Sequence, residues 1–105
     1  MKYKYGEITN KQLTLVKKKI RAKIYFALLI VEKKYDYDAD KAIVDVLLLL
    51  SGLNELLNYP KEIIIASSLL EEARKEIDNY KFYRKLIFDA GNEIAKIGGD
   101  TNAFI

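Results

Sequence analysis

Apolar residues recur every three or four positions along most of the chain, which is the spacing of one face of an α-helix. The first such stretch predicts a helix over residues 9–34, with Thr9 or Asn10 as its N-cap. From Ile24 to Val31 this helix is apolar on every side, so we expect that end at the centre of a bundle or at a subunit interface. The apolar face of the helix consists of Leu13, Val16, Ile20, Ile24, Ala27, Leu28 and Val31.

A second helix is predicted over residues 38–58, after a turn rich in aspartate and tyrosine. Asp38 or Asp40 is its N-cap, and acidic residues in a first turn also suit the helix dipole. Gly52 lies in its middle, where glycine costs about 1 kcal/mol relative to alanine, so we expect a kink or a close helix crossing there. Its apolar face consists of Ile43, Val46, Leu47, Leu50, Leu53, Leu56 and Leu57.

The segment after Pro60 predicts either two helices, over 60–78 and 79–97, or one helix over 61–97. The apolar phase continues from Ala73 to Ile97 without a slip, which favours one helix. Such a helix would be about 55 Å long, too long for the other helices to cover, and it would imply dimerisation along the overhang. We therefore expect a break near Asn79, where a helix can end and another be capped. Gly98-Gly99 is the expected C-cap of the last helix.

These elements predict a single all-α domain over residues 1–105, a four-helix bundle with short loops and alternating helix directions. Residues 1–7 are a short strand or a flexible arm, and residues 98–105 are a tail in which Phe104 and Ile105 can dock. A winged-helix arrangement is the alternative, with helices from the segment 21–52, but we find no convincing wing or recognition turn.

Composition then removes whole classes of function. The 105 residues contain neither cysteine nor histidine, which excludes Cys/His zinc sites, haem and iron–sulfur ligation by those residues, thiol catalysis and imidazole-dependent triads. The longest apolar run has eight residues, and the start of the chain has no apolar segment typical of a signal peptide, so we expect a cytoplasmic protein without a membrane partner. The lysine, isoleucine and tyrosine bias fits a thermophile or an AT-rich genome.

The remaining candidate chemistry is weak. Asp36, Asp38 and Asp40 are spaced like the start of a calcium loop, but Lys41 and Leu47 occupy the positions that require glycine and a bidentate glutamate. A cluster of glutamates in the third helix has no histidine three residues on, so we interpret it as a solvated face. The serines have neither a histidine base nor a Gly-x-Ser-x-Gly elbow. We expect no enzyme, no cofactor and no metal. A carboxylate-dependent metalloenzyme is a third hypothesis, which elemental analysis would test.

The charge is distributed unevenly, and this is the most informative polar feature. Residues 1–25 carry a net charge of +7 and the rest −4, giving the formal +3. Basic residues bind phosphates and aromatic rings stack on unpaired bases, so we consider a nucleic-acid contact without sequence readout. A lysine-rich solvated face is the plainer interpretation, because only three of the eighteen basic residues are arginine. The candidate contacts are Lys17, Lys18, Arg21 and Lys23, with Lys81, Arg84 and Lys85 in an aromatic segment.

The helices also carry more large apolar side chains than one face requires. The runs 47–50 and 63–65 place leucine and isoleucine at outward positions, and monomers rarely expose large apolar patches. A twofold homodimer is the commonest solution, with Leu48, Leu49, Ile64 and Ile65 as the predicted interface. The leading functional hypothesis is therefore self-association in an assembly, adaptor or regulatory role, and nucleic-acid binding is the alternative.

Overall fold

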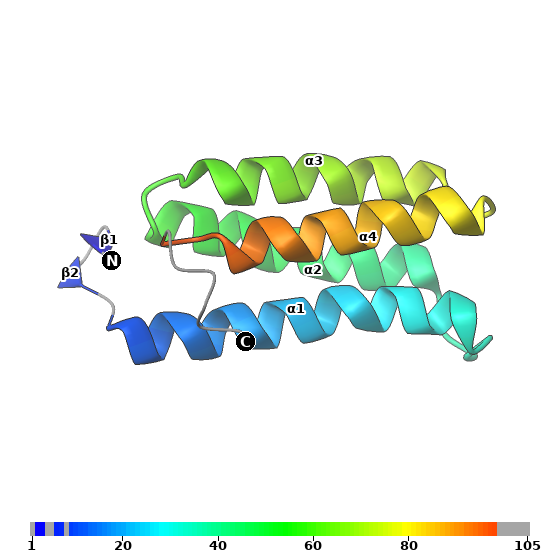
Figure 1. The fold of residues 1–105 in the computed structure, drawn as a ribbon, viewed down its shortest axis with the longest axis horizontal. Coiled ribbons are helices and arrows are strands. Elements are labelled where there is room, and N and C mark those ends of the chain that lie inside the picture. The colour runs from blue at the N-terminus through cyan, green and yellow to red at the C-terminus, as the bar shows by residue number, and fades with distance from the viewer. Residues whose placement is uncertain (1, 4–5, 8, 99–105) are drawn as a thin grey trace.

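The fold is a bundle of four helices, preceded by a minimal strand pair. The computed structural model describes residues 2–3, 6–7 and 9–98. The strands β1 (Lys2–Tyr3) and β2 (Gly6–Glu7) pair antiparallel, with Lys2 opposite Glu7. The helices are α1 (Asn10–Glu32), α2 (Ala39–Leu56), α3 (Lys61–Lys75) and α4 (Tyr80–Ala95), shown in Figure 1. The predicted four-helix bundle is confirmed and the winged-helix alternative is wrong. The predicted docking of Phe104 and Ile105 lies outside the described residues.

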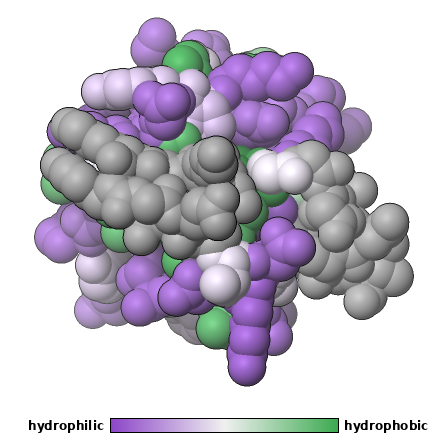
Figure 2. Space-filling view, turned by 90° about the vertical axis from the view of Figure 1, so that its left-hand side faces the viewer, coloured by the Kyte–Doolittle hydropathy of each residue, from purple (hydrophilic) through white to green (hydrophobic). Residues whose placement is uncertain are grey.

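Successive helices run in opposite directions, as the short loops predict. In Figure 1, α1 and α3 run from left to right, and α2 and α4 return. Helix α1 packs against α2 and α4, and α3 packs against the same two neighbours, so α1 and α3 occupy opposite corners. The end-on view in Figure 2 shows hydrophilic side chains around most of the described surface, with smaller hydrophobic areas between them.

The core is formed by the apolar faces that the helical spacing predicts. Its largest side chain is Tyr83, fully buried in α4, whose hydroxyl donates to the Ala27 carbonyl oxygen at 2.7 Å. Burial raises the pKa of the Tyr83 phenol to about 12, because a phenolate in this position would lose its hydration. The other large side chains that are fully buried are Ile24, Ile43, Leu50, Ile63, Leu70, Ile87, Ile94 and Ile97.

Local capping explains where the helices begin. Thr9 caps α1 in a capping box, since its hydroxyl accepts from the Gln12 amide while the Gln12 side chain accepts from the Thr9 amide. Asp38 caps α2 by accepting from two backbone amides of the first turn. Pro60 takes the N-cap position of α3, one residue before the first-turn position expected for it.

Two helices end on residues with left-handed backbone that are not glycine. The Tyr35 amide reaches back to the Ile30 carbonyl at the end of α1, and the Tyr59 amide to the Asn54 carbonyl at the end of α2. This is the Schellman arrangement, which requires a positive φ at the intervening residue. Lys34 has a φ of 53° and Asn58 a φ of 64°. The C-cap of α4 is Lys96, and the residue with a positive φ, of 82°, is Gly98, two positions further on, whereas the sequence predicted the cap at the glycine pair itself.

The helical segment after Pro60 is interrupted between α3 and α4, near Asn79, as expected. Helix α3 ends at Lys75, and the connecting turn is closed by a hydrogen bond from the Asn79 amide to the Glu76 carbonyl at 2.9 Å. The alternative prediction of one continuous helix over residues 61–97 is therefore wrong. The break lets α4 fold back against α3 and bury the apolar face that a single helix would have left uncovered.

The close helix crossing occurs at Gly91 and not at Gly52. A Cβ at Gly91 would lie 2.5 Å from the Tyr25 hydroxyl oxygen, so the missing side chain is what lets the tyrosine ring of α1 lie on α4. Gly52 is exposed, and a Cβ there would meet nothing within 4 Å among the described residues. The predicted close crossing at Gly52 is therefore wrong.

Candidate interaction surfaces

The four residues predicted to point outward from α2 and α3 are all exposed. Leu48 is 68% exposed and Ile64 is 53% exposed, and Leu49 and Ile65 are exposed as well. They do not share one direction, because successive helix residues are turned by about 100°. Leu49 follows Asp45 by one turn and therefore leans toward α1, where Asp45, Lys23 and Phe26 line a small hollow. Leu48 points away from the bundle.

A groove of about 700 Å³ runs between α2 and α3. Its walls include Leu47 and Ser51 from α2, and Ile64, Ser67 and Ser68 from α3. The three serines are too small to fill the space between these two helices, which is why the surface is hollowed here. Glu71, Glu72 and Lys75 line the groove as well. The structure thus places Ile64 in the wall of the groove, whereas Leu48 is exposed on α2, next in sequence to the wall residue Leu47.

The basic residues of α1 do not form one patch. Lys17 is only 2% exposed, and its ammonium donates to the Ile97 carbonyl oxygen at 2.6 Å. It therefore stabilises the C-terminal end of α4, where backbone carbonyls lack helical partners. The prediction that Lys17 contacts nucleic acid is wrong, because its amine faces the interior.

Lys23 lies on a different side of α1 from Lys18 and Arg21, which are three residues apart and therefore neighbours on the helix surface. Arg21 donates to the Tyr25 hydroxyl at 3.1 Å, on the side of α1 that faces α4. Lys23 lines the hollow toward α2 with Tyr37 and Asp45. Lys18 is exposed. A surface that binds one phosphate backbone with Arg21 cannot use Lys23 at the same time. Side chains two residues apart on a helix point in nearly opposite directions.

The basic residues of α4 are placed beside aromatic rings and acidic groups. The Arg84 guanidinium lies 4.6 Å from the centre of the Phe88 ring, and that ring lies 5.4 Å from the Tyr25 ring. With the Arg21 guanidinium 5.6 Å from the Tyr25 ring, the four side chains form a ladder across α1 and α4. We call this set the cation–aromatic ladder. Tyr25 and Phe88 are absent from the sequence prediction, because only the pairing of two distant helices brings them together.

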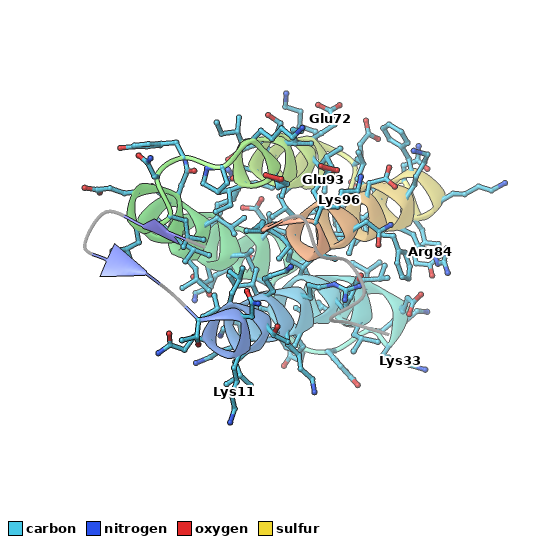
Figure 3. All side chains as sticks on the ribbon, turned by 60° about the vertical axis from the view of Figure 1, so that its left-hand side comes forward. Lys11, Lys33, Glu72, Arg84, Glu93 and Lys96 are labelled. Carbon is cyan, nitrogen blue, oxygen red and sulfur yellow. The ribbon has the colours of Figure 1, made fainter. Side chains whose placement is uncertain are left out.

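Acidic groups offset part of this positive charge. Glu32 accepts a short hydrogen bond from the Tyr80 hydroxyl, which raises the pKa of Tyr80. Glu32 also lies 4.0 Å from the Arg84 guanidinium, and Lys85 pairs with Asp89 at 2.8 Å. Figure 3 shows Arg84 on the outer side of α4. Lys81 is exposed on the same helix.

The acidic residues singled out in the sequence serve the helices themselves. Asp38 caps α2, and Asp40 pairs with the Arg74 guanidinium at 2.7 Å, which holds the pKa of Asp40 below its ordinary value. On α3, Glu71 pairs with Arg74 and Glu72 with Lys75. Among the residues that the structure describes, no three acidic side chains converge on a common point.

No described helix combines the length and the low charge that crossing a bilayer requires. No protein-family model matches the chain, and neither a curated protein nor a solved structure matches it significantly.

Proposed function

We propose that this chain is a non-catalytic helical protein that works by self-association, in an assembly, adaptor or regulatory role. The observation that carries this proposal is the exposure of Leu48 and Ile64 on two adjacent helices, together with a groove between these helices whose walls include Leu47 and Ile64. Exposed leucine and isoleucine next to an unfilled groove lose contact with water when a second molecule covers them, which favours association.

Charge introduced at Leu48 or Ile64 tests the proposal. Sedimentation analysis of the parent protein at rising concentration should show a monomer–dimer equilibrium, and Leu48→Lys or Ile64→Lys should give monomer. Leu15→Lys is the matched control, because Leu15 is 59% exposed but lies on α1. This control variant should dimerise like the parent. A parent that stays monomeric, or Leu48→Lys dimers of unchanged affinity, would overturn the proposal.

A second candidate is nucleic-acid binding without sequence readout, through the surface shared by α1 and α4. The cation–aromatic ladder favours it, because rings and guanidinium groups at a surface can stack on unpaired bases while lysines contact phosphates. Lys18 on α1 and Lys81 on α4 supply exposed ammonium groups on the two helices that hold the ladder.

Fluorescence anisotropy with single- and double-stranded oligonucleotides tests this candidate. Affinity for single strands should fall steeply between roughly 50 and 200 mM salt, since phosphate contacts release counterions. The double variant Lys18→Glu/Lys81→Glu should lose binding. The variant Lys61→Glu on α3 should retain it. Equal affinity of the double variant and the parent would exclude this surface.

A further inference from the structure

The exposed side of α2 has an ordered pattern of charge and size. Lys41, Leu48 and Glu55 are spaced by seven residues, so they lie within about 20° of one line along the helix. All three are exposed. Along the helix, Val44 lies between Lys41 and Leu48, and Gly52 lies between Leu48 and Glu55. We call these five residues the α2 stripe. Repetition every seven residues is the pattern by which two helices pack along their length.

The two charges of the α2 stripe are placed against the preference of their own helix. Lys41 lies in the first turn, at the positive end of the helix dipole, and Glu55 lies in the last turn, at the negative end. Within α2 both positions disfavour the charge they carry. Their placement is favourable, however, when an oppositely directed helix lies alongside, because its negative end then faces Lys41 and its positive end faces Glu55.

Only one orientation of a second copy satisfies this pattern. Leu48 lies seven residues from each charge, so a twofold axis beside Leu48 places Lys41 of one copy opposite Glu55 of the other, twice. Val44 then faces Gly52 of the second copy. The parallel orientation would instead place lysine opposite lysine and glutamate opposite glutamate, which is repulsive.

Shape agrees with the same arrangement. A Cβ at Gly52 would meet no atom of the described residues within 4 Å, so the backbone of α2 is accessible there to a side chain of a second molecule. A valine facing this glycine lets the two helices approach closely, as small residues do at helix interfaces. Beside the stripe, the groove walls Leu47 and Ile64 extend the apolar area that the second copy covers.

Resting on the proposed self-association, we infer that two copies pack α2 against α2 in antiparallel orientation, with Leu48 at the twofold axis and Lys41 of each copy paired with Glu55 of the other. The ion pair that Lys41 makes with Asp45 within its own chain does not compete strongly, because it is long, at 3.5 Å, and exposed.

Reciprocal charge reversal tests this geometry. Lys41→Glu and Glu55→Lys should each weaken self-association by about tenfold, since each homodimer then contains two repulsive pairs. An equimolar mixture of the two variants should restore parental affinity, because both contacts in the heterodimer are again between opposite charges. Both substitutions also suit the dipole of α2, so circular dichroism should show a fold at least as stable as the parent.

The control mixture pairs Glu55→Lys with Lys11→Glu. Lys11 is an exposed lysine that points away from the bundle on α1 (Figure 3), so Lys11→Glu keeps the parental α2 stripe and should itself associate like the parent. Its heterodimer with Glu55→Lys keeps one repulsive pair, so labelled Glu55→Lys should bind Lys11→Glu more weakly than it binds Lys41→Glu. The antiparallel geometry would be overturned if the reciprocal mixture associated no better than either variant alone. The proposed function would still stand in that case, provided that Leu48→Lys is a monomer. A parent protein that is monomeric throughout would overturn both.

Discussion

The Lys17 ammonium donates a 2.6 Å hydrogen bond to the Ile97 carbonyl oxygen, which joins two residues separated by 80 positions in the chain. Lys17 lies near the start of the longest helix, and Ile97 just past the end of the last one. The terminal carbonyls of a helix lack backbone partners and carry the negative end of the helix dipole, so a buried cation is favourable at this point. The lysine therefore links α1 to the end of α4.

Replacing Lys17 should destabilise the protein although it removes a charge from a basic chain. We expect Lys17→Ala to lower the free energy of unfolding by about 2–4 kcal/mol, through the lost hydrogen bond and the cavity left by the side chain. Lys17→Met keeps most of the packing and should cost less. The exposed neighbour is the control, and Lys18→Ala should stay within about 0.5 kcal/mol of the parent in urea unfolding. Equal effects at the two positions would contradict the role of the Lys17–Ile97 bond.

Lys17 also shows what sequence periodicity predicts and what it leaves open. The helix boundaries were predictable because caps are local: Thr9 and Asp38 act on amides within three residues. The phase of the helix also places Lys17 on the apolar face, one turn after Leu13 and one turn before Ile20. What the sequence could not show is the partner of Lys17, since the carbonyl oxygen that accepts its hydrogen bond belongs to Ile97, 80 positions further along the chain.

The candidate surfaces, too, were predictable from the sequence only in part. Outward positions such as Leu48 and Ile64 were predictable from the excess of large apolar residues over one helix face. The basic patch was predicted by position along the chain, whereas a surface depends on angle around the helix, and Arg21 and Lys23 therefore separate. The Tyr25–Phe88 contact depends on how α1 pairs with α4, and no local pattern encodes that pairing.

The contact between Gly91 and Tyr25 predicts a change of sign in a double-mutant cycle. Gly91→Ala should destabilise the parent by about 1–3 kcal/mol, because the new methyl group overlaps the tyrosine ring. In a Tyr25→Ala background the ring is absent, and the same substitution should stabilise by up to about 1 kcal/mol through helix propensity. Urea unfolding of the four proteins measures this coupling. Destabilisation of similar size in both backgrounds would show that Tyr25 is not the obstacle.

The backbone at Lys34 predicts a stabilising substitution. Its φ of 53° costs an L-residue roughly 1 kcal/mol relative to glycine, so Lys34→Gly should raise the free energy of unfolding by up to that amount. Lys33 precedes it with a φ of −97°, which any residue adopts, and Lys33→Gly should destabilise. Both variants remove one exposed lysine, so the net charge is matched. A melting temperature that moves in the same direction for both would refute the strain at Lys34.

The buried phenol of Tyr83 predicts an alkaline loss of stability that one substitution removes. The folded-state pKa is raised from 10.0 to about 12, so the folded protein prefers the protonated phenol. This contribution is fully present below pH 10 and is lost as the pH rises from 10 toward 12, at about 1.4 kcal/mol for each pH unit. Tyr83→Phe lacks the hydrogen bond to Ala27 but cannot ionise.

At pH 8 the parent should therefore be more stable than Tyr83→Phe by about 1 kcal/mol, the usual net worth of one hydrogen bond. By pH 11 this advantage should be gone, because the unfolded parent ionises at Tyr83 while the folded parent does not. All other lysines and tyrosines are common to both proteins, so their titration cancels in the difference between the two unfolding curves. A difference that stays constant from pH 8 to pH 11 would mean that Tyr83 ionises as readily in the folded protein as in the unfolded chain, and hence that water reaches its hydroxyl.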